Sequence, residues 1–251
     1  MTYCIVVSVK EGLVLTSDSR TNAGIDNVSV HRKMHALSTL PDRTIVLLSA
    51  GNLATTQAVI DQLVKDMHER ATPNLNSVTS LVEAAEYLGG MSVKKQNRHV
   101  NAGQNGFFPA ATFILAGQIG HMAHGAYLIY PEGNYITTSI HTPYLQIGEI
   151  KYGKPVLDRF LKNDTGLHEA GRCCLISMDS TMRSNVSVGP PVDLLLYRKD
   201  SFNLENYYCF AEDDNYLIQL RRQWHEKLKE SFATLPPFCS EDKQTLACHE
   251  A

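Results

Sequence analysis

The order of hydrophobic and polar residues predicts strands near the start of the chain. Residues 3–9 and 13–18 are rich in β-branched side chains, and the turn-like segment Lys10-Glu11-Gly12 lies between them. This pattern predicts a β-hairpin. The residues 45–48 are apolar without interruption, which predicts a strand covered on both faces. Further strands are expected at residues 34–38, 44–50, 111–117, 125–130, 135–138, 192–197 and 207–211.

The spacing of the apolar residues changes after Gly51-Asn52. From Leu53 onward these residues recur at i, i+3 or i+4, and i+7, which is typical of an amphipathic helix. Ser77 and Ser80 supply capping chemistry for a second helix. Later helices are expected at residues 150–161, 168–182 and 213–232, with loops at 21–27 and 101–109.

The predicted elements follow the order strands, two helices, strands, two helices, strands and a final helix. Because the helices come in pairs, this order disfavours a Rossmann fold, in which single helices alternate with strands. It favours an α/β (α+β) fold with four αββα layers, in which two mainly antiparallel sheets lie between helix layers. We expect one domain over residues 1–235, followed by a flexible polar tail at 236–251.

Composition and charge exclude several classes of protein. The chain has 251 residues and a net charge of −3, which argues against a nucleic-acid-binding protein. No apolar run reaches the roughly 18 residues of a membrane span. The apolar start of the chain ends at Ser8, so we expect no signal peptide. The six cysteines contain no C-x-x-C pair, and we interpret them as reduced thiols in a cytoplasmic protein.

Chemically, the most informative residue is Thr2. Threonine is small enough for Met1 to be trimmed, which would leave a chain that begins with a hydroxyl and a free α-amine. An α-amine titrates near about 7.7–8.0, so part of it is neutral at cellular pH. A neutral amine can serve as the base for its own hydroxyl. The alternative is that Thr2 is merely a tolerated second residue.

Two charged residues are expected close to Thr2. The predicted hairpin brings Asp18 back toward the chain start, and Lys33 stands at the beginning of the next strand. An ammonium beside the nucleophile would lower the pKa of the hydroxyl and of the amine, and a carboxylate would hold that ammonium in place. Taken separately, Asp18 and Lys33 are ordinary surface charges.

Several motifs along the chain are informative in combination. They are Thr2 after a lone methionine, Gly12-Leu13-Val14-Leu15-Thr16-Ser17-Asp18-Ser19-Arg20, Arg32-Lys33-Met34, Ser49-Ala50-Gly51-Asn52-Leu53-Ala54, Leu115-Ala116-Gly117-Gln118, Leu128-Ile129-Tyr130-Pro131-Glu132-Gly133, Ile147-Gly148-Glu149-Ile150-Lys151-Tyr152-Gly153-Lys154-Pro155 and Asp179-Ser180-Thr181-Met182-Arg183-Ser184-Asn185. Together these motifs resemble the proteasome β-subunit and HslV lineage of N-terminal nucleophile (Ntn) hydrolases. The resemblance is greatest to the bacterial Anbu family of proteasome relatives and extends to about residue 235.

This resemblance implies catalytic roles for particular residues. Thr2 matches the nucleophile of the family, Asp18 its aspartate and Lys33 its lysine. Gly51 matches the glycine whose N–H forms the oxyanion hole, and such a group near a helix start is unpaired. The alternative for Gly51 is a plain turn. The resemblance further implies a peptide or protein substrate and a large homo-oligomer that encloses its active sites; it leaves an ATP-dependent partner undetermined.

The sequence departs from the proteasome pattern around the supporting residues. Glu149 stands where a serine is expected, and Asn185 and Val188 replace an aspartate and a serine. Ser187 lies close enough to substitute, and Arg20 is a further supporting candidate. Glu149 either orders the lysine or the amine, or caps the following helix. Two other functions therefore stay open: a non-catalytic scaffold subunit, and an Ntn amidase or transferase acting on a small molecule or special peptide.

Three other groups of residues suggest metal or nucleic-acid binding, but none of them fits such a site. His121 and His124 are three residues apart and have no nearby carboxylate, unlike the i, i+4 histidines of zinc helices. Cys248-His249 lies in the predicted tail. The basic cluster at 94–99 is too small for a nucleic-acid footprint. We therefore predict no metal, no cofactor, no nucleic acid and no membrane among the partners.

Overall fold

The computed structural model describes residues 1–22, 28–100 and 109–238. Most of the predicted loop at 101–109, part of the predicted loop at 21–27, and Cys248-His249 lie outside the described residues. The chain divides into two compact units, Met1–Asp214 and Asn215–Ala251. The domain boundary expected at residue 235 stays a prediction.

Within the described residues of the first unit, antiparallel strands form two five-stranded sheets and a small hairpin. The first sheet has the order β10 (Tyr144–Gly148), β1 (Tyr3–Val9), β2 (Gly12–Asp18), β11 (Val192–Arg198) and β12 (Tyr207–Phe210). The second has the order β5 (Met34–Leu40), β6 (Arg43–Gly51), β7 (Ala111–Ile119), β8 (Gly125–Ile129) and β9 (Tyr135–Thr137). The hairpin consists of β3 (Arg20–Asn22) and β4 (Val28–Val30).

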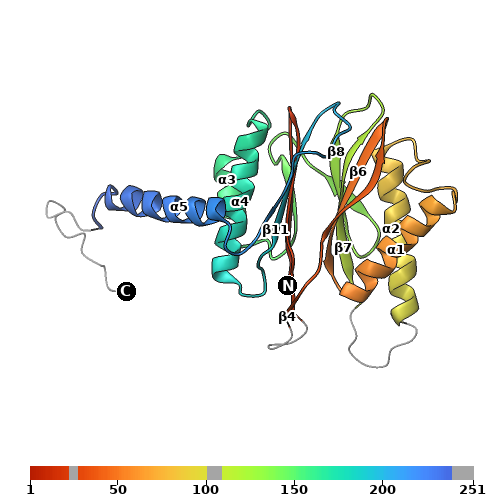
Figure 1. The fold of residues 1–251 in the computed structure, drawn as a ribbon, viewed down its shortest axis with the longest axis horizontal. Coiled ribbons are helices and arrows are strands. Elements are labelled where there is room, and N and C mark those ends of the chain that lie inside the picture. The colour runs from red at the N-terminus through yellow and green to blue at the C-terminus, as the bar shows by residue number, and fades with distance from the viewer. Residues whose placement is uncertain (23–27, 101–108, 239–251) are drawn as a thin grey trace, which may run out of the picture. The chain divides into compact units, whose positions relative to one another are not determined.

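Helices cover the outer faces of both sheets (Figure 1). On one side, α1 (Leu53–His68) and α2 (Leu81–Val100) pack against β6, β7 and β8. On the other, α4 (Leu167–Ser184) packs against β1, β2 and β11, with α3 (Lys154–Phe160) beside it. The predicted four-layer αββα fold is therefore confirmed.

The second unit contains the helix α5 (Asn215–Ala233). It corresponds closely to the helix expected at residues 213–232. Among the described residues, no helix is both long enough and apolar enough to cross a membrane.

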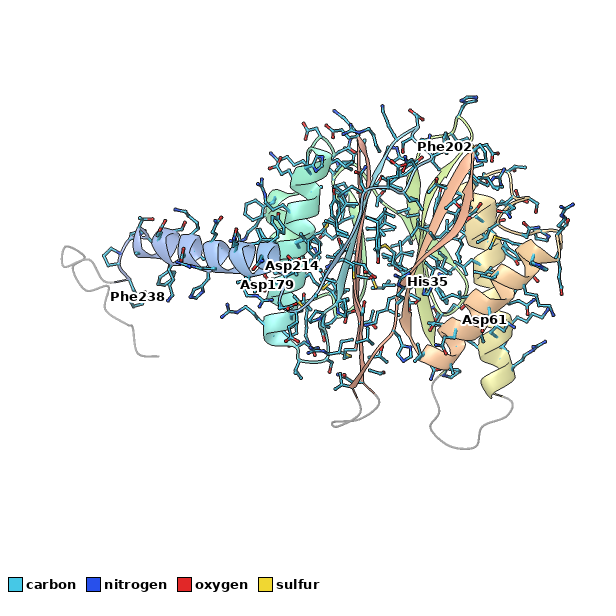
Figure 2. All side chains as sticks on the ribbon, in the orientation of Figure 1. His35, Asp61, Asp179, Phe202, Asp214 and Phe238 are labelled. Atoms are coloured by element: carbon cyan, nitrogen blue, oxygen red, sulfur yellow. The ribbon has the colours of Figure 1, made fainter. Side chains whose placement is uncertain are left out.

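Strand β6 shows why a continuous apolar sequence becomes a central strand. Val46 and Leu48 face the core between the sheets, whereas Ile45 and Leu47 face the core beneath α1 and α2. All four side chains are at most 2% exposed. Neighbouring residues of a strand point to opposite faces, so both faces of β6 must be apolar. Figure 2 shows the side chains that fill the space between the sheets.

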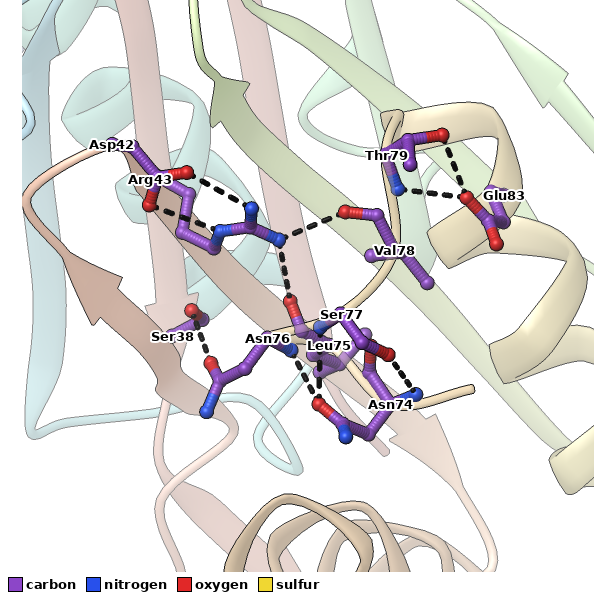
Figure 3. Close-up of polar contacts among 10 residues, drawn as sticks. All are labelled: Ser38, Asp42, Arg43, Asn74, Leu75, Asn76, Ser77, Val78, Thr79 and Glu83. Carbon is purple, nitrogen blue, oxygen red and sulfur yellow. Dashed lines mark hydrogen bonds and ion pairs between the residues drawn. The ribbon is translucent and has the colours of Figure 1, made fainter. Parts of the chain in front are cut away.

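Arg43, on strand β6, forms hydrogen bonds with the segment that precedes α2 (Figure 3). Arg43 Nη1 donates to the carbonyl oxygens of Val78, at 2.8 Å, and Leu75, at 3.4 Å. The Asn74 side chain accepts from the backbone of Asn76 at 2.7 Å. These bonds satisfy backbone groups of an irregular segment and hold the start of α2 on the sheet.

Three local expectations need correction. Strand β10 was not predicted, and its pairing with β1 is what makes it a strand. Residues 20–22 form strand β3 instead of lying entirely within a loop or the preceding strand. The helix expected at 150–161 begins only at Lys154, because residues 151–153 form a turn. A Cβ at Gly153 would lie 2.3 Å from Tyr3 Oη, so Gly153 packs too closely for any larger residue.

Candidate active site

The β1–β2 hairpin brings Asp18 to the start of the chain, as the sequence predicted. Cys4 pairs with Ser17 across the hairpin, so Asp18 lies opposite Tyr3. The Tyr3 N–H donates to Asp18 Oδ1 at 3.0 Å. The carboxylate is therefore fixed by the backbone of the residue that follows Thr2.

Lys33 reaches the same carboxylate from the segment between β4 and β5. Its ammonium lies 2.7 Å from Asp18 Oδ1 and donates to the Arg20 carbonyl at 2.6 Å. Asp18 is fully buried and Lys33 is 5% exposed. The second carboxylate oxygen accepts from the Gly189 N–H at 3.2 Å.

The electrostatics of Asp18 reflect this enclosure. Burial raises the pKa of Asp18, and the Lys33 ammonium and the backbone N–H groups of Tyr3 and Gly189 oppose the rise. A carboxylate with these donors is held in one position. The pair therefore forms a rigid support on which the Lys33 side chain is oriented.

Gly51 lies at the end of β6, directly before the N-cap of α1. Its φ angle is +110°, and a Cβ there would lie 2.4 Å from the Ala110 carbonyl oxygen. Asn52 is the N-cap, and its side chain accepts from the Thr55 N–H at 3.1 Å. Only glycine suits this backbone conformation. The positive end of the α1 dipole is thus directed to this region.

A cavity of about 540 Å³ joins these residues. Thr2, Lys33 and Gly51 all contribute to its lining, and Asp18 supports Lys33 from behind. The remaining lining residues are Met1, Thr21, Asn22, Arg32, Ser49, Ala50, Asn52, Leu53, Thr56 and Gly148. The four residues singled out as catalytic thus meet at one place, although they come from different elements.

Glu149 lies on the other side of Thr2. Its backbone N–H donates to the Thr2 carbonyl oxygen at 2.7 Å, and its carboxylate accepts from Asn185 Nδ2 at 2.8 Å. Lys151 Nζ lies 3.7 Å from the other carboxylate oxygen. The helix-capping alternative for Glu149 is wrong, because the N-cap of α3 is Gly153.

The other supporting candidates act through the loop that follows α4. Arg20 Nη1 donates to the Val186 carbonyl at 2.9 Å. The Ser187 N–H donates to Asn185 Oδ1 at 3.0 Å, so Ser187 contributes through its backbone. Val188 is buried. These contacts hold the loop whose Gly189 N–H binds Asp18.

Sequence reasoning missed the contributions of backbone groups. The N–H groups of Tyr3 and Gly189 and the carbonyl of Arg20 complete the Asp18–Lys33 pair. Backbone groups are the same in every residue, so no side-chain pattern could have predicted them. Gly189 had one possible signal, its position directly before Pro190-Pro191 in the sequence.

The chain terminus lies in a charged environment. Burial, together with the Lys33 ammonium, lowers the pKa of the Met1 amine, whereas Asp18 and Glu149 act to raise it. A terminal amine in this region is therefore influenced by one cation and two carboxylates.

Comparison with known proteins identifies the family. No protein-family model and no curated sequence matches the chain. Among solved structures, Anbu (ancestral beta-subunit) from Yersinia bercovieri is 43% identical, with a TM-score of 0.89 over 94% of this chain and 99% of that chain. The chain belongs to the Anbu family. The resemblance inferred from the sequence motifs is thereby confirmed.

Two further Anbu structures are also similar to this chain over nearly its whole length. A structure described as the helical assembly of the Anbu complex from Pseudomonas aeruginosa is 42% identical, with a TM-score of 0.90 over 96% of this chain and all of that chain. Anbu from Hyphomicrobium sp. strain MC1 is 36% identical, with a TM-score of 0.87 over 95% of this chain and all of that chain. Membership in a proteasome-like family is thus supported over nearly the whole chain.

Proposed function

We propose that this Anbu chain, once Met1 is removed, is an N-terminal threonine hydrolase that cleaves peptide bonds. The observation that carries the proposal is the buried Lys33–Asp18 pair, 2.7 Å apart, whose lysine lines the same cavity as Thr2. A buried ion pair in a cavity that also holds a terminal hydroxyl is a suitable environment for activating a nucleophile.

In the proposed reaction, Thr2 Oγ1 attacks the amide carbonyl and its proton passes to the neutral α-amine of the same residue. The amine then donates this proton to the leaving nitrogen as the C–N bond breaks, which leaves a Thr2 ester. Water attacks the ester, with the amine again as the base, and releases the second product. Lys33 supplies positive charge beside Thr2, and Asp18 holds it there.

Gly51 is proposed to bind the developing oxyanion. The Ser49 N–H donates to the Lys33 carbonyl at 3.0 Å, and alternation along β6 directs the Gly51 N–H to the same side. The nearby α1 N-terminus adds favourable potential for negative charge. This arrangement would stabilise the tetrahedral intermediate beside Thr2.

We further propose that copies of the chain assemble into a large homo-oligomer that encloses these sites. The helical assembly described for the relative from Pseudomonas aeruginosa supports association in this family. The particle mass of the purified protein, measured by light scattering, tests this part. A monomer at all concentrations would contradict it.

The catalytic proposal is tested by intact mass and by a threonine-directed epoxyketone. We expect purified protein without Met1 to gain one inhibitor mass per chain. The Thr2→Ala variant is expected to retain the fold and to gain none. Peptide mapping should locate the adduct on residue 2.

The outcomes separate this function from the alternatives. Retention of Met1 in cells would eliminate the mechanism, because no free threonine amine would exist. Loss of Met1 without any adduct would favour a scaffold subunit. We expect activity to be weak or narrow, since Glu149 and Asn185 replace the usual polar partners. Labelling without cleavage of any peptide in a library would favour an Ntn amidase or transferase.

A further inference from the structure

A buried carboxylate lies beside the terminus on the side opposite to Asp18. Glu149 is 6% exposed, and its position is set by the sheet: Gly148 pairs with Tyr3, and the Glu149 N–H binds the Thr2 carbonyl at 2.7 Å. A Cβ at Gly148 would lie 1.9 Å from the same carbonyl oxygen. The backbone of residues 148–149 therefore packs directly on that of Thr2.

The Glu149 side chain is also held in one orientation. Asn185 Nδ2 donates to Oε2 at 2.8 Å, and the Ser187 N–H binds Asn185 Oδ1 at 3.0 Å. The second bond identifies Oδ1 as the acceptor and leaves Nδ2 to face the carboxylate. Lys151 is 3.7 Å away with a side chain 66% exposed, so its pairing with Glu149 is weak.

The Glu149 carboxylate is one of several charged groups near the terminal amine. Lys33 is a nearby cation, and Asp18 is already bound to it at 2.7 Å. Arg32 adds a second positive charge to the lining of the same cavity. A second ammonium at the terminus would be repelled by Lys33. Because residues 148–149 pair with the start of β1 on the edge opposite to β2, the buried Glu149 carboxylate supplies negative charge on the other side of the terminus. It can therefore offset this repulsion and hold the amine in place.

We propose that Glu149, oriented by Asn185, is a positioning residue that holds the α-amine of Thr2 and favours its protonated form. This assignment rests on the proposed function where it concerns the amine as base. The pH at which the amine becomes a free base then depends on burial of the terminus, on Lys33 and Asp18 on one side, and on Glu149 on the other. Among the described residues, Glu149 is not one of those that line the cavity.

The test uses Glu149→Gln, which keeps the shape but removes the charge. Without this charge the amine pKa falls, so the neutral amine is present at lower pH. We expect the midpoint of acetylation of the terminal amine by acetic anhydride, followed by mass spectrometry, to fall by about one pH unit. The midpoint of Thr2 labelling by the epoxyketone should fall by the same amount.

Glu132→Gln, in the exposed turn between β8 and β9, is the matched control and should leave both midpoints unchanged. A purely structural role for Glu149 would change the melting temperature without moving the midpoints. An amine midpoint in Glu149→Gln that is unchanged or higher overturns the assignment. If this variant does not fold, Asn185→Ala replaces it: a fall in the amine midpoint supports the assignment, and no fall overturns it.

The two proposals fail in different ways. A lower amine midpoint in a protein that the epoxyketone never labels supports the role of Glu149 and contradicts the hydrolase. If the epoxyketone labels Thr2 and the amine midpoint is the same in wild type and Glu149→Gln, the hydrolase is supported and the role of Glu149 is contradicted.

Discussion

Lys33 and Asp18 are stable inside the protein only as a pair. Each is almost completely removed from water, and the 2.7 Å contact compensates part of the cost of dehydrating two charges. If one partner is deleted, the other remains buried and uncompensated. The pair is therefore both a structural and a chemical requirement of the site.

We expect Lys33→Ala to lower the free energy of unfolding by about 3–5 kcal/mol, because Asp18 loses its counter-ion. Labelling of Thr2 should disappear as well. Urea unfolding and inhibitor labelling measure the two effects. Lys151→Ala removes a lysine whose side chain is 66% exposed, and should change stability by no more than about 1 kcal/mol. Equal effects of the two substitutions would contradict this account.

Gly51 is expected to be intolerant of even one methyl group. Its φ of +110° and the 2.4 Å approach to the Ala110 carbonyl predict a loss of about 1–3 kcal/mol for Gly51→Ala. Displacement of the Gly51 N–H should also reduce the labelling rate. Gly90→Ala is the matched control, because Gly90 lies in α2 with open space around it. That substitution should be neutral or stabilising by up to about 1 kcal/mol.

At the scale of elements, helix α2 begins where the sequence places its cap. Ser80 Oγ accepts from the Glu83 N–H at 3.1 Å, and Glu83 Oε2 accepts from the Thr79 N–H at 2.7 Å. This reciprocal pattern is close to a capping box, and it satisfies donors that the first helical turn leaves unpaired.

Ser80→Ala is expected to cost about 1 kcal/mol, since one of these donors loses its acceptor. For a chain of this size this corresponds to a fall of about 2–4 °C in the melting temperature. Differential scanning calorimetry measures it. Ser231→Ala, an exposed position in α5, serves as the control and should melt within about 1 °C of wild type. A fall in the control alone would contradict the role of the cap.

Strand β10 marks the limit of reasoning from local pattern. The strand has only five residues, and Gln146 interrupts its apolar sequence. The segment becomes a strand because it pairs with β1. A strand at a sheet edge depends on a partner far away in the sequence, here some 140 residues distant. Periodicity within a short window carries no information about that partner.

At the scale of the whole molecule, the expected boundary at residue 235 can be tested directly. We predict that a chain ending at residue 235 melts within about 1 °C of the full chain, because residues 236–251 contain no periodic apolar pattern. Calorimetry of the two proteins under identical conditions is the measurement. A markedly lower melting temperature of the shorter chain would show that the final segment contributes to stability.

Much of the candidate active site can be predicted from the sequence alone. Hairpin geometry predicts that Asp18 lies near Thr2, and the resemblance to Anbu adds Lys33 and Gly51. In the structure, Thr2, Lys33 and Gly51 line one cavity, and Asp18 lies behind Lys33. Their catalytic roles stay predictions. The sequence leaves two roles open for Glu149, capping of the following helix and contact with the chain terminus. The residue at which α3 begins decides between them, and the sequence does not give that residue.

The αββα layers follow from local sequence patterns, because alternating and helical apolar periods specify which face each strand or helix must bury. The sequence also predicts the cap of α2 and the hairpin that returns Asp18 to the chain start. The contacts of Asn185 with Glu149 and of Gly189 with Asp18, by contrast, could be found only in the folded chain. These contacts join residues more than 30 positions apart through groups that any loop could offer. Their formation depends on how the sheets and helices pack, and local sequence patterns do not encode that packing.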